Sequence, residues 1–246
     1  MGWPDGVDRI VLDRVDSTMA EASRRAQAGS GPVWVLAREQ TAGRGRRGRV
    51  WAHPPGNFAA TLLMTPSGGP EYAALRSFVM ALALHDALAG LIGSAAGLAL
   101  KWPNDVLLSG GKMAGILLET VGAAGGQLAI GVGVNLIAAP PADGVEPGAV
   151  RPVSVLAETG QRVAPEAMLD ALAPAFAGWE RQLRAYGFGP VRDAWLTRAA
   201  RLGETVTARM ARRSLTGTFE TVDETGAIVL KTPDGRRAIA AAEIFF

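Results

Sequence analysis

The chain has 246 residues, which is enough for one large domain or for a medium-sized domain followed by a small one. Its 25 basic and 23 acidic side chains leave a net charge of only +2, which argues against a protein held on DNA by its overall field. The absence of cysteine excludes disulfides, thiolate catalysis and cysteine zinc sites, and His53 and His85 are too few for a histidine metal cluster.

Neither a signal peptide nor a membrane span is expected from the sequence. The N-terminus reads Met-Gly-Trp-Pro-Asp-Gly and lacks the basic start and the apolar stretch of a signal peptide. No apolar run is long and uninterrupted enough to cross a bilayer. We therefore expect a cytoplasmic protein with no membrane partner.

In chain order, the first part of the sequence alternates strands with helices. The apolar pattern predicts strands at 10–12, 33–37 and 57–64 and helices at 19–28 and 72–91. Ser17 stands where a helix N-cap is expected. The second helix has an apolar stripe at helical spacing, and Arg76 and Asp86 are expected off that face.

The middle of the chain predicts a meander of strands and then two helices. The strands are expected at 98–102, 106–108, 112–121 and 127–136, and the helices at 165–186 and 190–201. Ser109-Gly110-Gly111 predicts a hairpin turn, and the Pro- and Ala-rich stretch 138–152 predicts a surface loop. Pro174 is expected to kink or split the first of the two helices.

The pattern changes after residue 202, where short strands follow one another closely. They are expected at 205–210, 215–222, 227–231 and 237–241, with turns at 223–226 and 233–235. This spacing favours a small β-barrel of SH3-like size.

The most unusual stretch is Gly43–Arg49, which contains three glycines, four arginines and no apolar side chain. Four guanidinium groups this close repel one another, so the loop is expected to become ordered only when an anion supplies countercharge. Glycine lets the backbone approach a ligand, and backbone N–H groups and arginine forks can bind phosphates or a carboxylate. Taken alone, the run is more typical of a solvated, disordered loop or of a nucleic-acid patch than of a ligand-binding loop.

Two further segments stand out, one because it forms a turn with polar side chains and one because every second residue is glycine. Lys101-Trp102-Pro103-Asn104-Asp105 ends a strand, so Asn104 and Asp105 project from the rim of the sheet, although Asn-Asp after proline is often only a turn. Only three of the 25 basic residues are lysine, and Lys101 and Lys112 both lie in this region, which hints that a compact ammonium matters there. Glycine alternates with valine from Gly131 to Val134, either for packing or for a flat ligand.

In their order and spacing, these motifs resemble the biotin–protein ligase family. The matching segments are Ser17-Thr18, Gly43–Arg49, Lys101–Asp105, Gly111–Glu119 and Gly131–Asn135. The resemblance is strong over about residues 10–136 and looser in the C-terminal strands. One departure is Met19, where the family commonly has asparagine.

The resemblance implies a two-step reaction. Biotin reacts with Mg-ATP to give biotinyl-5′-AMP and pyrophosphate, and a lysine of a biotin carboxyl carrier protein then takes the biotin and releases AMP. The implied biotin-binding residues are Ser17, Thr18, Met19, Gln40, Gly43, Arg44, Gly45, Arg46, Lys112 and Gly115. The implied ATP-binding residues are Arg46, Arg47, Arg49, Trp51, Asn104, Asp105, Lys112 and Asn135. Lys112 and Arg46 are the expected catalytic side chains, and Asp105 is the expected Mg²⁺ ligand.

The resemblance also implies an α+β fold. A mixed-sheet catalytic domain resembling class II aminoacyl-tRNA synthetases, expected at 1–201, is followed by the SH3-like barrel at 202–246. Many family members form homodimers through the catalytic sheet. Others carry an N-terminal winged helix and repress transcription, but the first expected strand here begins at residue 10, so we expect no DNA binding.

Two other functions are weighed against this one. A lipoate–protein ligase shares the fold and the adenylation chemistry, but it is expected to carry an Arg-Arg-x-x-Gly-Gly-Gly signature in place of the alternating Gly/Arg loop. A nucleic-acid-binding module would use the loop as an arm, and stacking residues interleaved in the loop would favour it. The chain has the alternating Gly/Arg loop, which disfavours the lipoate ligase, and the absence of aromatic residues from Gly43–Arg49 together with the near-neutral net charge disfavours the nucleic-acid module.

Overall fold

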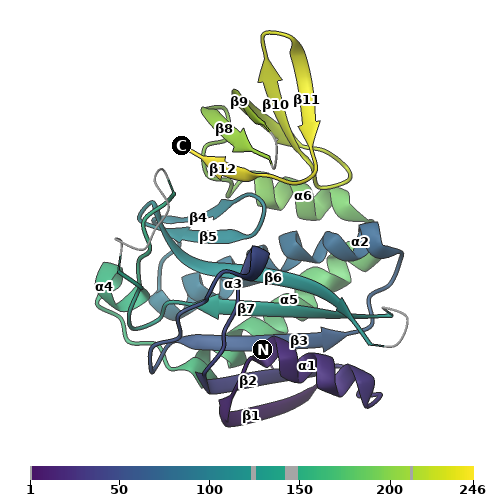
Figure 1. The fold of residues 1–246 in the computed structure, drawn as a ribbon, viewed down its shortest axis with the longest axis vertical. Helices are drawn as coiled ribbons and strands as arrows, with labels where there is room; N and C mark the ends of the chain where they lie inside the picture. The colour runs from purple at the N-terminus through teal and green to yellow at the C-terminus, as the bar shows by residue number, and fades with distance from the viewer. Residues whose placement is uncertain (1, 123–125, 142–148, 211–212) are drawn as a thin grey trace.

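The residues that the structure describes form two β-sheets, and the smaller one lies above the larger one in Figure 1. The structure is a computed structural model that describes residues 2–122, 126–141, 149–210 and 213–246. The larger sheet has seven strands in the order β1-β2-β3-β7-β6-β5-β4. These strands are β1 (Asp8–Val15), β2 (Val33–Gln40), β3 (Phe58–Met64), β4 (Leu98–Lys101), β5 (Asp105–Leu108), β6 (Gly111–Val121) and β7 (Gln127–Val134).

The seven-stranded sheet is mixed. β1 and β2 are parallel, and all other neighbouring strands are antiparallel. The β1–β2 connection is α1 (Thr18–Gln27), which allows the two strands to run in the same direction. The predicted strands and the predicted α+β class with a mixed sheet are confirmed.

Helices cover both faces of this sheet. α1 packs on one face, while α3 (Arg76–Ile92) and α5 (Pro165–Tyr186) pack together on the other. The alternation of β2 reflects this arrangement: Val33 and Val35 pack in the cluster with α1, whereas Trp34 and Leu36 belong to the larger core with α3 and α5. The described residues also form the short helices α2 (Pro70–Ala74), α4 (Val155–Thr159) and α6 (Phe188–Leu196) and a 3₁₀ turn, η1, at Arg46–Gly48.

One helical stretch, Glu71–Ile92, has the length and the mean hydropathy, 1.5, of a membrane-spanning segment. Its apolar window is 67% buried inside the protein, against the sheet and α5. This is the pattern of a core helix in a chain whose sheet needs one face covered.

The second sheet is antiparallel, with the order β11-β10-β9-β8-β12. Its strands are β8 (Thr205–Arg209), β9 (Ser214–Val222), β10 (Ile228–Thr232), β11 (Gly235–Ile239) and β12 (Glu243–Phe245). It lies beyond the β4–β5 end of the large sheet, next to α6 (Figure 1). Trp195 of α6 packs against Phe219 of β9, and the Trp102 indole donates a hydrogen bond to the Gly226 carbonyl, so the small sheet is fixed against the part of the protein that contains the large sheet.

Several predicted details differ from the structure. Arg76 was expected off the apolar face, but it is fully buried and pairs with Glu180 of α5 at 2.8 Å. Pro174 does not split α5, which is one helix from Pro165 to Tyr186. The helix predicted at 190–201 is observed as α6, from Phe188 to Leu196, so it begins and ends earlier than predicted. A further strand, β12, follows the strand predicted at 237–241. Of the expected loop at 138–152, residues 142–148 lie outside the described residues.

Candidate active site

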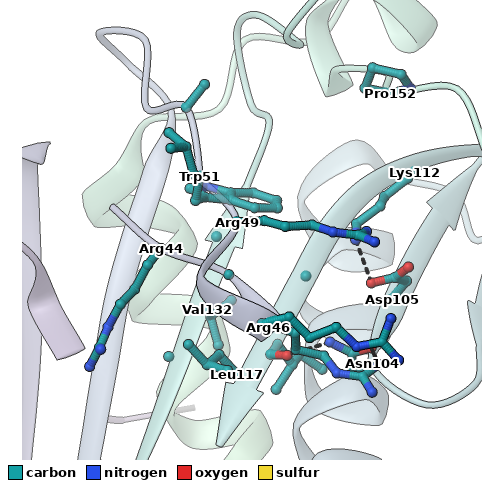
Figure 2. A pocket seen from close by; sticks show the side chains of 18 of the residues that line it. Arg44, Arg46, Arg49, Trp51, Asn104, Asp105, Lys112, Leu117, Val132 and Pro152 are labelled. Carbon is teal, nitrogen blue, oxygen red and sulfur yellow. Dashed lines mark hydrogen bonds and ion pairs between the residues drawn. The ribbon is translucent and has the colours of Figure 1, made fainter. Parts of the chain in front are cut away.

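A cavity of about 1060 Å³ opens over the face of the large sheet that carries α1. It is lined by the N-terminal end of α1, by the arginine loop, by β6 and β7, by the turn after β4 and by β12 of the barrel. Its volume is at the upper end of the range for small-molecule sites. Segments that are far apart in the sequence therefore meet at one site, part of which Figure 2 shows.

The polar part of the cavity lies at the start of α1. Ser17 caps this helix, as predicted, because its Oγ accepts a hydrogen bond from the Met19 N–H at 3.2 Å. Thr61 of β3 donates to the Thr18 hydroxyl at 2.8 Å, and Thr18 in turn donates through its hydroxyl and its backbone N–H to Gln40 Oε1. The Gln40 carbonyl is thus occupied twice, which leaves its amide nitrogen as the group able to donate toward a ligand.

His53 fixes the same glutamine from the backbone side. Its Nδ1 accepts a hydrogen bond from the Gln40 N–H at 3.1 Å, so the ring donates through Nε2 to the Asn57 carbonyl at 2.9 Å. Burial lowers the pKa of His53, in agreement with a neutral ring in this arrangement. The sequence analysis gives His53 no role in the site, and its role in holding Gln40 emerges from the fold.

Glycine residues form a smooth floor to the cavity. The β6–β7 register places Gly115 opposite Gly133 and Leu117 opposite Gly131. A Cβ added at Gly133 would lie 2.3 Å from the Trp51 indole, and one at Gly131 would lie 2.7 Å from the Met19 sulfur. Trp51 and Met19 therefore occupy the space that these glycines leave open. The side chain of a larger residue at either strand position would take that space from them.

The arginine loop finds countercharge within the protein. Arg44 pairs with Glu119 of β6 at 2.8 Å, and it points away from Lys112 and Asp105 in Figure 2. Arg47 and Arg49 both pair with Glu243 of β12, at 3.2 and 2.8 Å. Protein carboxylates thus occupy positions where the sequence predicted that only a ligand would bring negative charge.

The remaining arginine of the loop, Arg46, lines the cavity. Its Nη1 donates to Asn104 Oδ1 at 3.0 Å, and Asn104 donates to the Ile116 carbonyl at 2.6 Å. Burial lowers the pKa of Arg46, and the neighbouring Arg47 and Arg49 lower it further, while Asp105 opposes them. A half-buried guanidinium beside a neutral amide is well placed to bind an incoming anion.

A cluster of opposite charges lies next to Arg46. Lys112 Nζ is 2.7 Å from Asp105 Oδ1 (Figure 2), and Lys101 Nζ is 3.9 Å from Asp105 Oδ2. Asp105 is largely buried, with 13% of its side chain exposed. The turn that carries these residues contains a cis peptide bond before Pro103. Two lysines and an arginine thus surround one carboxylate, and the group has an excess of positive charge.

The sequence matches two families of known proteins. Residues 11–135 match the biotin/lipoate A/B protein ligase family, and residues 202–246 match the biotin protein ligase C-terminal domain. The chain is also 59% identical over 238 residues to a biotin–[acetyl-CoA-carboxylase] ligase of Paracoccus denitrificans, covering 96% of this chain and 99% of that protein. The chain belongs to the biotin/lipoate A/B protein ligase family.

Solved structures of biotin protein ligases have the same fold. The enzyme from Aquifex aeolicus in complex with biotin and ATP superposes with a TM-score of 0.83 at 24% identity, covering 96% of this chain and 97% of that one. The enzyme from Leishmania major in complex with biotinyl-5-AMP superposes with a TM-score of 0.67 at 24% identity, covering 97% and 100%. Both likenesses establish a ligase fold for the catalytic sheet and the barrel.

Nearly all of the site residues expected from the ligase resemblance line this one cavity. They are Ser17, Thr18, Met19, Gln40, Arg44, Gly45, Arg46, Arg47, Arg49, Trp51, Asn104, Asp105, Lys112, Gly115 and Asn135. Gly43 is the exception, because it does not line the cavity. A Cβ there would lie 2.7 Å from the Trp51 carbonyl, so glycine is needed for the close approach of the two ends of the loop.

Some residues of this ligase site were not expected from the sequence. Thr61 holds Thr18, Lys101 lies beside Asp105, and Glu243 binds the arginine loop from the barrel. The scarcity of lysine was a signal for Lys101. Thr61 and Glu243 carry no motif, and only the folded chain brings them to the site.

Proposed function

We propose that this protein is a biotin–protein ligase that forms biotinyl-5′-AMP from biotin and ATP and then transfers biotin to a lysine of a biotin carboxyl carrier protein. The observation that carries the proposal is a single cavity that joins a neutral polar pocket at α1 to a strongly cationic group around Lys112. A neutral ureido ring with a carboxylate tail and a polyphosphate fits this division of charge.

Biotin binds with its ureido ring at the start of α1. The Ser17 hydroxyl oxygen already accepts a hydrogen bond, and so does Gln40 Oε1, so both side chains offer hydrogen atoms to a carbonyl oxygen. The N-terminal end of α1 favours the same partial negative charge. Met19 and Leu117 add apolar surface beside the ring, since a polar head in a mostly apolar pocket needs its hydrogen bonds matched.

The first chemical step takes place at Lys112. A carboxylate oxygen of biotin attacks the α-phosphorus of ATP, the bond to the bridging oxygen breaks, and pyrophosphate leaves with the electron pair. Negative charge builds at the α-phosphoryl group, and the Lys112 ammonium and the Arg46 guanidinium stabilise it. A compact ammonium suits this crowded point better than a planar fork.

In the second step, the amine of the carrier lysine attacks the carbonyl carbon of the mixed anhydride and AMP leaves, which forms an amide. Trp51 and Asn135 hold the adenine side, and Arg47 and Arg49 close over the phosphates. Closure of the loop keeps water from the reactive anhydride.

The residues at the phosphate end are compatible with Mg²⁺ that arrives with ATP. Asp105 Oδ1 is buried and has no hydrogen-bond donor within the described residues, apart from its charge contact with Lys112. Mg²⁺ typically takes one or two carboxylates and completes its shell with substrate phosphates and water. Asp105 would hold the ion, and the ion would supply positive charge to the phosphates.

A mass measurement tests the function directly. The purified protein is incubated with Mg-ATP and either biotin or lipoate, and its native mass is recorded. We expect an adenylate to be retained with biotin and not with lipoate. Retention with lipoate alone would favour a lipoate ligase, and retention with neither acid would refute the proposal.

The role of Lys112 has its own test. Lys112→Ala should slow adenylate formation by on the order of 10²–10³-fold, the typical loss of one preorganised charge contact at a developing anion. Biotin affinity should fall less than the rate, and Lys112→Arg should also be impaired. Lys231→Ala, on the exposed face of β10, serves as the matched control. Turnover of Lys112→Ala close to that of the wild type would remove Lys112 from the catalytic role.

A further inference from the structure

Lys101 is a buried lysine of the cavity wall, and an anion bound there would stabilise its charge. It is the last residue of β4, where the β4–β5 hairpin places it opposite Asp105. Only 8% of its side chain is exposed, and it lines the cavity. Burial, together with the nearby Lys112 and Arg46, lowers the pKa of Lys101, whereas Asp105 and Glu243 raise it.

The contact between Lys101 and Asp105 does not satisfy the ammonium group. The separation from Asp105 Oδ2 is 3.9 Å, which is too long for a hydrogen bond, and the carboxylate already has Lys112 at 2.7 Å on its other oxygen. Among the described residues, Lys101 also faces the Phe246 ring, whose centroid lies 5.7 Å from Nζ. A largely buried ammonium is costly unless acceptors bind it, and a structural ion pair would be expected to close the distance to Asp105.

The two lysines divide the neighbourhood of Asp105 into two sides. Lys112 lies on the Oδ1 side, under the Trp51 ring, with a separation of 6.0 Å between Nζ and the ring centroid. Lys101 lies on the Oδ2 side, toward the C-terminal barrel and its Phe246. A polyphosphate whose α-phosphoryl group is held by Lys112 can continue past Asp105 to reach Lys101.

We propose that Lys101 binds the β- and γ-phosphates of ATP and stabilises the pyrophosphate that leaves in the first step. The inference rests on the proposed adenylation of biotin. When the bond between the α-phosphorus and the bridging oxygen breaks, the electron pair stays on the pyrophosphate oxygen, and Lys101 keeps its proton and neutralises part of that charge. Lys112 acts on the α-phosphoryl group in both half-reactions, whereas Lys101 acts in the first alone.

The test separates the two half-reactions. Lys101→Met keeps a straight side chain of similar volume and removes the charge, and Lys231→Met is the matched control on the barrel surface. For Lys101→Met we expect the kcat/KM for ATP to fall by on the order of 10- to 100-fold, as for the loss of one hydrogen bond to a charged group, and inhibition by pyrophosphate to weaken comparably. Transfer of biotin from preformed biotinyl-5′-AMP to a carrier domain should stay within about 2-fold of the wild type, because that step involves no pyrophosphate.

The outcomes distinguish a phosphate-binding role of Lys101 from a structural one. Equal losses in both half-reactions would assign Lys101 a structural role, and an unchanged first half-reaction would also overturn the proposal. If Lys101→Met does not fold, Lys101→Gln, which also removes the charge, is measured in the same assays, and unaltered KM for ATP together with unaltered pyrophosphate inhibition would refute the proposal. Calorimetric titration of the wild type and the variant with Mg-pyrophosphate, without biotin, tests the site even if wild-type protein forms no biotinyl adenylate.

Discussion

Glu243 is predicted to hold the arginine loop closed in the absence of ligands. Its carboxylate lies within 3.6 Å of Arg47, Arg49 and Arg209, and the arginine side chains are 38–53% exposed. Such half-exposed pairs contribute about 0.2–1 kcal/mol each, and two of them, with Arg47 and Arg49, join Glu243 to the loop, so Glu243→Gln should cost the closed loop about 0.4–2 kcal/mol. A change of this size raises the population of open loops by about 2- to 30-fold.

Limited proteolysis measures this population. Trypsin cuts after arginine, and the loop offers Arg44, Arg46, Arg47 and Arg49. When opening is fast relative to cleavage, the rate of nicking follows the open population, so Glu243→Gln should be nicked in the loop about 2- to 30-fold faster. Glu220→Gln is the matched control, because Glu220 pairs with Arg236 elsewhere on the barrel. Raised salt should speed nicking of the wild type and have less effect on Glu243→Gln.

The pH dependence follows from the carboxylate. Burial alone would raise the pKa of Glu243, but the hydrogen bond from Arg49 and the charges of Arg49, Arg47 and Arg209 lower it overall. A lowered pKa means that the closed loop is stabilised above the ordinary carboxylate pKa and loses this stabilisation as pH falls through the lowered value. The rate at which trypsin nicks the loop of the wild-type protein should therefore be constant between about pH 6 and pH 8. Equal nicking of Glu243→Gln and Glu220→Gln in the loop would refute the reasoning.

Two further substitutions test packing. Gly133→Ala should displace the Trp51 indole, because a Cβ there would lie 2.3 Å from the ring, and we expect KM for ATP to rise more than KM for biotin in steady-state assays. Gly189→Ala, where a Cβ meets nothing within 4 Å, should leave both constants unchanged, and equal effects of the two variants would contradict this view. Arg76→Met leaves Glu180 buried without its partner and should cost about 3–5 kcal/mol in chemical denaturation. The double variant Arg76→Met/Glu180→Met should recover most of that loss, and failure to recover would contradict the ion-pair argument.

Local signals carried most of the fold prediction. The cap at Ser17, the apolar periodicities and the turn residues depend on near neighbours in the chain, so the strands of the large sheet and the helices α1 and α5 could be located from the sequence. The candidate site was predictable for a different reason. Its residues lie in short motifs at strand ends and turns, and the sheet gathers those ends around one cavity.

Long-range pairing explains what the sequence could not reveal. Arg76 is expected on the outer face of its helix because a charge is costly to bury, and its burial depends on the carboxylate of Glu180, 104 residues away, together with the nearby Tyr72 carbonyl and Ser67 hydroxyl. Likewise, the countercharge of Arg49 comes from Glu243, which is 194 residues away. No periodicity or motif reports such partners, so the loop was expected to await a ligand.

The two glycines of β7 that face the cavity have a consequence for evolutionary variation. The space at Gly131 is filled by the Met19 sulfur from α1, and the space at Gly133 is filled by Trp51 from the arginine loop. Each glycine therefore forms a complementary pair of volumes with a side chain from a distant segment. A larger residue on the strand is tolerable when the partner shrinks, so positions 19 and 131, and positions 51 and 133, should co-vary among homologues as two separate pairs. Substitutions at the two positions of β7 would then follow changes at the α1 end of the cavity and changes in the arginine loop independently of each other.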